Sequence, residues 1–274
     1  MTIKSILLHL TNSPTLAKSI EAAMGLANEH GAHITAVYTI APMKPSTSFM
    51  GYIPPEFVEQ TREQEKKSAD TTIKLFKELV ERADISCSTI IEEGYAIDIL
   101  SQYALSSDLV VVSQMDADEV SDSPYLYLND ELVVASPTPV LVIPYAGSFR
   151  DFGRHVLVGW NNTREAARAI QVAIPFLTKA EKVTLLNINP QSDLTNENAR
   201  ILQFLDRHGV KADLKSGHWK DISVGSALLD SLVDLSADMI VMGAYGHSRI
   251  REMILGGATK EVLEQMTAPV LFAH

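Results

Sequence analysis

The strand segments of the first half of this chain recur in the second half in the same order, which limits the chain to folds that can be built twice. The aligned segments are residues 6–13 with 156–163, residues 106–112 with 236–242, and residues 138–143 with 268–273. The first pair is 150 positions apart and the other two pairs are 130 positions apart. Such self-similarity predicts two copies of one folding unit. We expect domains over residues 1–146 and 154–274.

Short apolar strands alternate with helical segments in each half, which predicts β-α-β units and parallel sheets. In the second half we expect strands near 155–160, 183–189, 211–216, 238–243 and 269–273. Helices are expected at about 163–178, 194–208, 223–236 and 257–266. Asn162 is the expected N-cap of the first of these helices, with Glu165 completing a capping box. The fold class is therefore α/β, with two tandem Rossmann-like domains.

The change in spacing from 150 to 130 means that the first half carries about twenty extra residues. Residues 41–60 are the simplest place for them, because this stretch contains four prolines and a glycine. We expect an insertion that is mostly loop and that acts as a lid. The stretch from 56 to 81 mixes acidic and basic residues at helical spacing, which is typical of a solvated outer face.

Glycines follow the apolar run 239–242 and reappear before the last predicted helix. They are Gly243, Gly246, Gly256 and Gly257. Glycines allow sharp turns and close backbone approach, and the N–H groups at a helix start favour an anion. This arrangement predicts a cradle for a nucleotide phosphate, although turn chemistry alone also accounts for a lone pattern of glycines.

The spacing Gly-x2-Gly-x9-Gly resembles the nucleotide-binding signature of the universal stress protein family. In the ATP-binding members the residue after the last glycine is usually Ser or Thr, whereas this chain has Gly257. The resemblance implies an open five-stranded parallel sheet of order 3-2-1-4-5 in each half, with helices on both faces. It also implies that the last strands, 139–143 and 269–273, form a seam between the halves. The alternative is that both are plain edge strands.

The same resemblance assigns base contacts in the second half to Asn161, Ile188 and Met242. Asn161 stands where the family has an acidic residue, so it can form hydrogen bonds but supplies no charge. Gly159 and Trp160 lie at the end of the first strand, beside the expected site. Trp160 either flanks the base or packs under a neighbouring helix.

The phosphate end of the expected site contains the remaining candidates. His247 and Arg249 lie in the loop between the glycines, where they either meet phosphate oxygens or belong to a solvated loop. Ala258 and Thr259 follow Gly257 at the helix start. Thr259 offers the nearest hydroxyl after the missing Ser, or it caps its own helix.

The first half lacks these glycines. At the positions of Gly243, Gly246, Gly256 and Gly257 it has Ser113, Asp116, Leu126 and Tyr127. Residues 116–131 contain six acidic residues and no Lys or Arg, whereas residues 246–261 contain three basic and two acidic residues. Phosphate should be repelled from the first half and tolerated in the second. We therefore expect one degenerate domain and one working domain.

Composition excludes several classes of protein. The net charge of −11 argues against a general binder of nucleic acids or anionic membranes. The single cysteine excludes an internal disulfide and any multi-thiolate metal site. No Walker A sequence, Gly-x-Gly-x-x-Gly fingerprint or Gly-x-Ser-x-Gly elbow is present. No apolar run is long enough to span a bilayer, so we expect a soluble, cytoplasmic protein.

The leading hypothesis is a tandem universal stress protein whose second domain binds ATP and whose role in stress is regulatory or protective, as the resemblance implies. Any Mg²⁺ would be carried by the nucleotide, and no catalytic residue is predicted. The first alternative is an interaction module that binds protein partners and no nucleotide. The second is a slow nucleotide hydrolase. The two halves should pair as an intrachain pseudo-dimer, and a homodimer stays open.

Overall fold

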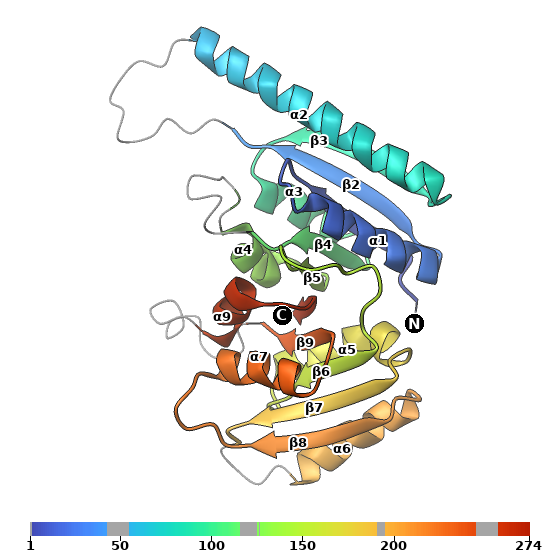
Figure 1. Ribbon diagram of the computed structural model, residues 1–274, viewed down its shortest axis with the longest axis vertical. Coiled ribbons are helices and arrows are strands. Elements are labelled where there is room, and N and C mark those ends of the chain that lie inside the picture. Colours follow the sequence, from blue (N-terminus) through green and yellow to red (C-terminus); the bar gives the residue numbers. More distant parts are fainter. Residues whose placement is uncertain (1, 43–54, 116–124, 126, 191–194, 245–256) are drawn as a thin grey trace.

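A computed structural model describes residues 2–42, 55–115, 125, 127–190, 195–244 and 257–274. Ten strands form one sheet in the order β3-β2-β1-β4-β5-β10-β9-β6-β7-β8. Each half of that order reads 3-2-1-4-5 in its own numbering, as the resemblance implied. Figure 1 shows the two halves stacked along the long axis of the molecule.

The elements of the first half are β1 (Ser5–Leu10), α1 (Leu16–His30), β2 (His33–Ile40), α2 (Pro55–Arg82), β3 (Cys87–Glu93), α3 (Ala96–Ala104), β4 (Leu109–Ser113), α4 (Leu128–Ala135) and β5 (Val140–Ile143). Those of the second half are β6 (His155–Gly159), α5 (Arg164–Leu177), β7 (Lys182–Ile188), α6 (Thr195–Arg207), β8 (Ala212–Gly217), α7 (Val224–Asp234), β9 (Met239–Gly243), α9 (Ala258–Gln265) and β10 (Val270–Ala273). The strands and helices predicted for the second half are confirmed to within about two residues.

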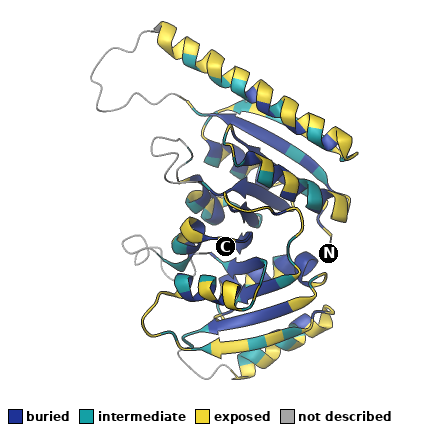
Figure 2. Ribbon diagram, in the orientation of Figure 1, coloured by how far each residue is buried: buried dark blue, intermediate teal, exposed yellow. Residues whose placement is uncertain are grey.

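Helices cover both faces of the sheet. Side chains of α1, α2, α5 and α6 pack on one face, and side chains of α3, α4, α7 and α9 pack on the other. The strands between them are buried on both sides, which suits their continuous Val, Ile and Leu runs. Burial decreases toward the two outer strands, β3 and β8, as Figure 2 shows.

The seam between the halves is an antiparallel pair of the two last strands. Leu141 of β5 lies opposite Leu271 of β10, flanked by Val142 with Val270 and Val140 with Phe272. The predicted seam is confirmed. Gln114, buried at the end of β4, strengthens it by donating from Nε2 to the backbone oxygen of Leu263 at 2.8 Å.

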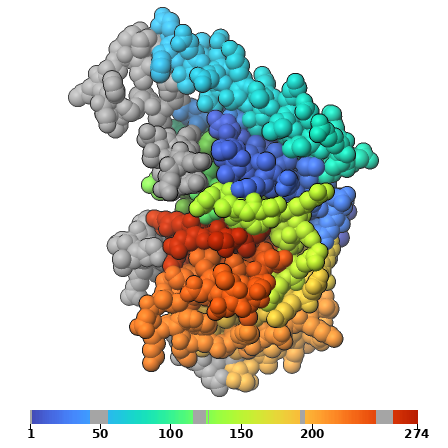
Figure 3. Space-filling model, viewed as in Figure 1, coloured from blue at the N-terminus to red at the C-terminus, as the bar shows by residue number. Residues whose placement is uncertain are grey.

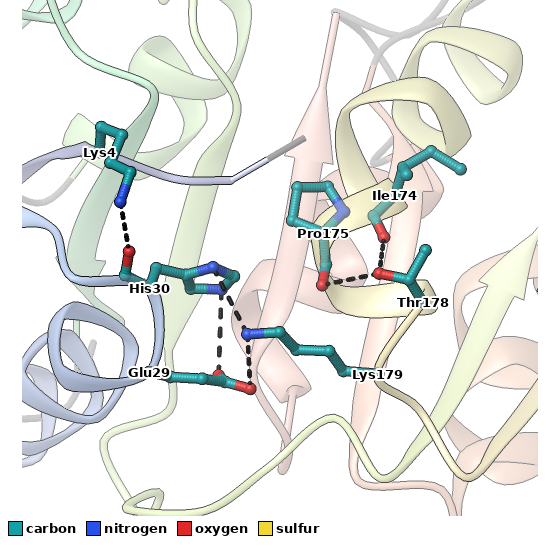
Figure 4. A network of polar contacts seen from close by, with 7 residues as sticks. All are labelled: Lys4, Glu29, His30, Ile174, Pro175, Thr178 and Lys179. Carbon is teal, nitrogen blue, oxygen red and sulfur yellow. Dashed lines mark hydrogen bonds and ion pairs between the residues drawn. The ribbon is translucent and has the colours of Figure 1, made fainter. Parts of the chain in front are cut away.

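A second contact joins the carboxyl ends of α1 and α5 (Figure 4). Lys179 Nζ lies 2.9 Å from Glu29 Oε1 and 3.5 Å from His30 Nδ1. The His30 ring also meets the Phe176 ring edge to face, with centroids 6.5 Å apart. The segment connecting the halves, residues 144–154, runs across the surface between them and is yellow-green in Figure 3. The halves are therefore joined on both sides of the seam.

Helix α2 corrects part of the expected insertion. Residues 43–54 lie outside the described residues, and residues 55–60, the last part of the expected insertion, begin a helix that continues to Arg82. Figure 2 shows α2 exposed along most of its length, with a buried stripe that includes Ala69, Phe76 and Val80. The mixed charges of this helix face outward, as predicted. None of the described helices combines the length and apolarity needed to cross a bilayer.

The N-terminus of α5 differs from the expected capping box by one residue. Thr163 is the N-cap, and its hydroxyl accepts from the backbone N–H of Ala166 at 3.3 Å. Asn162 has a left-handed backbone, with φ of 57°, and lies before the cap. Asparagine tolerates this conformation better than most residues. The prediction that Asn162 caps the helix is therefore wrong.

Candidate functional site

The candidate site lies at the carboxyl ends of β6, β7 and β9, on the sheet face covered by α7 and α9. Met242 belongs to the apolar cluster on this face, and Ile188 packs against the same cluster. A Cβ on Gly159 would lie 3.6 Å from Met242 Cβ, so Gly159 also faces this side. The structure thus brings together three of the predicted contacts: Gly159, Ile188 and Met242.

Gly243 is required by the packing of α5. A Cβ at this position would lie 2.6 Å from the carbonyl carbon of Glu165 and 2.7 Å from the backbone nitrogen of Ala166. The first turn of α5 therefore rests directly on the end of β9. This glycine permits close approach of protein backbone, which is a sufficient structural reason for it even without a ligand.

Asn161 is exposed beside the site and is partly occupied by its own turn. Its Oδ1 accepts from the Thr163 hydroxyl at 2.8 Å and from the Thr163 backbone N–H at 3.3 Å. These contacts support the cap of α5. The described contacts use only Oδ1, so the Nδ2 amide is the group that Asn161 offers to a ligand.

Trp160 lies on the opposite face and does not flank the site. It is 5% exposed, and its indole N–H donates to Asn198 Oδ1 of α6 at 3.0 Å. The stacking role considered for Trp160 is wrong, and the alternative, packing under a helix, is confirmed. Its ring helps to line a cavity of about 240 Å³ between α5 and α6, on the far side of the sheet from α9.

Two helix N-termini meet at the candidate site, and one is already occupied. Glu261, in the first turn of α9, accepts hydrogen bonds from the hydroxyls of Ser223 and Ser226 at the start of α7. Burial raises the pKa of Glu261, but these hydrogen bonds outweigh it, so the pKa lies below its ordinary value. Gly225 is needed here, because a Cβ would lie 2.9 Å from Glu261 Cβ, which cannot move without the backbone of α9. The N-terminus of α7 thus binds a carboxylate of the protein itself.

The N-terminus of α9 begins with glycine. Gly257 is the N-cap, with φ of −71° and ψ of 166°, and Ala258 is the first helical residue. Thr259 is buried at the second helical position, so it is not the cap of α9, contrary to the expectation. Because Gly257 has no side chain, an anion approaching the first N–H groups meets only backbone there.

Four predicted phosphate contacts lie outside the described residues. They are Gly246, His247, Arg249 and Gly256. Their roles stay predictions. Within the described residues no cluster of three His, Cys, Asp or Glu side chains forms a metal site.

The corresponding position in the first half is filled by side chains. His9 pairs with Val37 across β1 and β2 in the same way that Gly159 pairs with Leu186 across β6 and β7. His9 is 3% exposed, its Nε2 lies 3.0 Å from Thr39 Oγ1, and its ring meets the Tyr125 ring edge to face at 5.3 Å.

Tyr125 closes this cluster by donating from its hydroxyl to the backbone oxygen of Thr39 at 2.6 Å. Burial lowers the pKa of His9 to about 4, so the ring is neutral at pH 7. At this strand end the first half therefore has the packed side chains of His9, Thr39 and Tyr125, whereas the second half has Gly159, which has no side chain.

A clamp beside Ile188 was not anticipated from the sequence. Asn189 donates from Nδ2 to the Trp219 backbone oxygen at 3.1 Å and accepts at Oδ1 from the Trp219 backbone N–H at 2.7 Å. The Trp219 ring lies over Gly217, where a Cβ would meet ring atoms at 2.6 Å. The length of the connection could have indicated this contact. Six residues separate β8 from α7, whereas two separate β3 from α3 in the first half.

Comparison with known proteins supports the same fold over the whole chain. The universal stress protein family profile matches residues 217–274. Universal stress protein Slr1230 of Synechocystis sp. (strain ATCC 27184 / PCC 6803 / Kazusa) is 24% identical over 294 residues, covering 98% of this chain and 99% of that protein.

Two solved structures show the same architecture. A universal stress protein from Archaeoglobus fulgidus DSM 4304 has a TM-score of 0.78 at 15% identity and covers 99% of this chain and 96% of its own. A putative universal stress protein from Pseudomonas aeruginosa UCBPP-PA14 has a TM-score of 0.57 at 16% identity, with coverage of 99% and 93%. The tandem arrangement therefore extends over nearly the full length of these structures.

Proposed function

We propose that this chain, which belongs to the universal stress protein family, binds one adenine nucleotide in its second half. ATP is the proposed ligand, with its phosphates at the start of α9 and its base near Ile188. The observation that carries the proposal is the difference between the halves. Equivalent strand ends carry Gly159, which has no side chain, in the second half and the packed ring of His9 in the first.

The choice of α9 over α7 for the phosphates follows from which hydrogen-bond donors are already used. The Ser223 and Ser226 hydroxyls at the start of α7 already donate to the Glu261 carboxylate. The start of α9 has Gly257 at the N-cap, and the helix dipole there favours negative charge. One phosphate site per chain is the consequence.

We further infer that the protein binds the nucleotide without turning it over. Two carboxylates are described beside the site, and both are engaged. Glu165 Oε1 lies 3.0 Å from a guanidinium nitrogen of Arg164. Glu261 accepts hydrogen bonds from the Ser223 and Ser226 hydroxyls. Neither is placed as a base over a water, so the protein would act as a nucleotide-dependent regulatory or protective factor in stress.

The test is isothermal titration of the nucleotide-stripped full chain with ATP and Mg²⁺, using two variants of Gly257. Gly257→Asp keeps a good N-cap residue but places a carboxylate at the phosphate, so ATP affinity should fall at least about tenfold. Gly257→Ser adds a hydroxyl without charge and should bind at least as tightly as the natural chain. Assays for ADP formation should show none above background.

Equal ATP affinity in the Asp and Ser variants would show that the phosphates do not bind at the start of α9. An absence of heat and of thermal stabilisation in the natural chain at millimolar ATP would reject nucleotide binding altogether. The interaction module would then be the better hypothesis.

A further inference from the structure

We propose that Trp219 forms the base-binding wall of the nucleotide site and makes it selective for purines. The inference rests on the proposed function and adds the residue that recognises the base. Trp219 lies on the connection between β8 and α7, on the same sheet face as α9.

The position of the Trp219 ring is determined by the strand register. Ile188 of β7 pairs with Gly217 of β8, and paired residues of parallel strands point to the same face. A Cβ on Gly217 would point into the Trp219 ring. The ring therefore lies beside the Ile188 side chain, at the outer end of the surface that continues to Gly159 and Met242.

The wall is held in place by its backbone. Asn189, with a left-handed φ of 48°, places its carboxamide against both the N–H and the C=O of Trp219. The backbone N–H of Asn189 also donates to Gly217 at 2.9 Å. A ring whose backbone is held in this way loses little conformational freedom on stacking, which favours binding.

The wall and the proposed phosphate position lie in different parts of the second half. Trp219 follows β8 at the edge of the sheet, and β8 lies three strands from β9 in the sheet order. Neighbouring strands are about 4.8 Å apart, so β8 and β9 are separated by roughly 14 Å. A ligand that contacts Trp219 and reaches across the sheet toward β9 must therefore be extended, as a nucleotide is. Trp219 is partly exposed, and a purine covers more of an indole than a pyrimidine does, so the exposed part of the ring favours a purine.

The first half has no such wall. Glu92 of β3 is level with Thr39, as Gly217 is level with Ile188, and its carboxylate accepts from the Tyr103 hydroxyl at 2.9 Å. The two-residue connection after β3 leaves no room for a loop like that of Trp219. The wall is thus a property of the second half alone.

The experiment is titration of the full chain and of Trp219→Ala and Trp219→Phe with three ligands: ATP, CTP and inorganic tripolyphosphate. The natural chain should bind ATP more tightly than CTP. Trp219→Ala should lose about tenfold or more in ATP affinity while its tripolyphosphate affinity stays within about twofold, and Trp219→Phe should retain most of the ATP affinity. Unchanged ATP affinity in Trp219→Ala, or equal losses for ATP and tripolyphosphate, would overturn the inference.

A fluorescence titration supplies an independent reading that needs no change at Trp219. The chain has two tryptophans, so Trp160→Phe leaves Trp219 as the only indole emitter. ATP should quench its emission and tripolyphosphate should not. If ATP binds without any change in this emission, the base lies elsewhere. If the natural chain binds neither ligand, the proposed function itself fails.

Discussion

Equivalent strand ends in the two halves carry opposite kinds of side chain. The first half places His9 and Thr39 at the ends of β1 and β2 and seals them with Tyr125. The second half has Gly159 and Ile188 at the matching positions. The backbone order of the sheet is the same in both. The comparison shows that the same sheet order accepts either packed polar side chains or a glycine and an apolar side chain at these strand ends.

The halves also differ in how their helices approach the sheet. Ser113 at the end of β4 lies 2.7 Å, Oγ to Oγ, from Ser19 of α1, so a side chain fits between helix and strand. Gly243 at the end of β9 leaves no such space, because the backbone of α5 touches it. The second half is therefore more tightly packed behind the site, where the backbone of α5 touches β9.

The largest expected effect comes from copying the first-half residue into the second half, as Gly243→Ser. The new Cβ would overlap the backbone of Glu165 and Ala166, and overpacking against backbone should lower the free energy of unfolding by about 3 kcal/mol. Urea denaturation of the natural chain and the variant measures this loss of unfolding free energy. The reciprocal change Ser113→Gly removes one hydrogen bond and should lower the same quantity by about 1 kcal/mol. Equal effects would mean that the two helices approach the sheet alike.

The buried His9 should make the stability of the first half depend on pH. Its folded pKa of about 4 lies below the ordinary value of 6.5. Between these values the unfolded chain binds a proton that the folded chain does not. Lowering the pH from 6.5 to 4 should therefore remove about 2–3 kcal/mol of unfolding free energy relative to pH 7.

His9→Gln is the matched variant for this measurement, because it has an amide in place of the titrating ring. The difference between the natural chain and His9→Gln, measured by denaturation at several pH values, should change across this window and be constant above pH 7.5. A difference that is the same at every pH would show that His9 is not buried as described.

A smaller effect is expected for the carboxylate that caps α7. Glu261→Gln keeps the shape but removes the charge that accepts from Ser223 and Ser226, so the unfolding free energy should fall by about 1 kcal/mol at pH 7. The equivalent first-half residue is Glu131, which is exposed, and Glu131→Gln should change stability by less than about 0.5 kcal/mol.

The stabilisation by Glu261 should depend on pH in one direction only. The folded pKa of Glu261 lies below its ordinary value, so its stabilisation is complete above the unfolded pKa and disappears as the pH falls through the folded pKa. The gap between natural chain and Glu261→Gln should therefore close in acid. A gap that widens on acidification would contradict the capping role.

Much of the fold was predictable from the sequence. Internal repetition, apolar runs and turn residues gave the strands and helices of the second half, and the family resemblance implied the sheet order and the β5–β10 seam. These features depend on local patterns of burial, which a sequence displays directly. Gly159 and Met242 could be grouped because the carboxyl ends of parallel strands share one edge of the sheet, and the family resemblance added Ile188.

The tertiary structure decided which side chains face that edge and which elements already occupy it. The sequence shows two tryptophans near strand ends, but only the three-dimensional packing places Trp160 under α6 and Trp219 over Gly217. Likewise Glu261 reads as an ordinary surface residue until α7 is brought beside it. Such assignments depend on contacts between segments far apart in the chain, so no local pattern contains them.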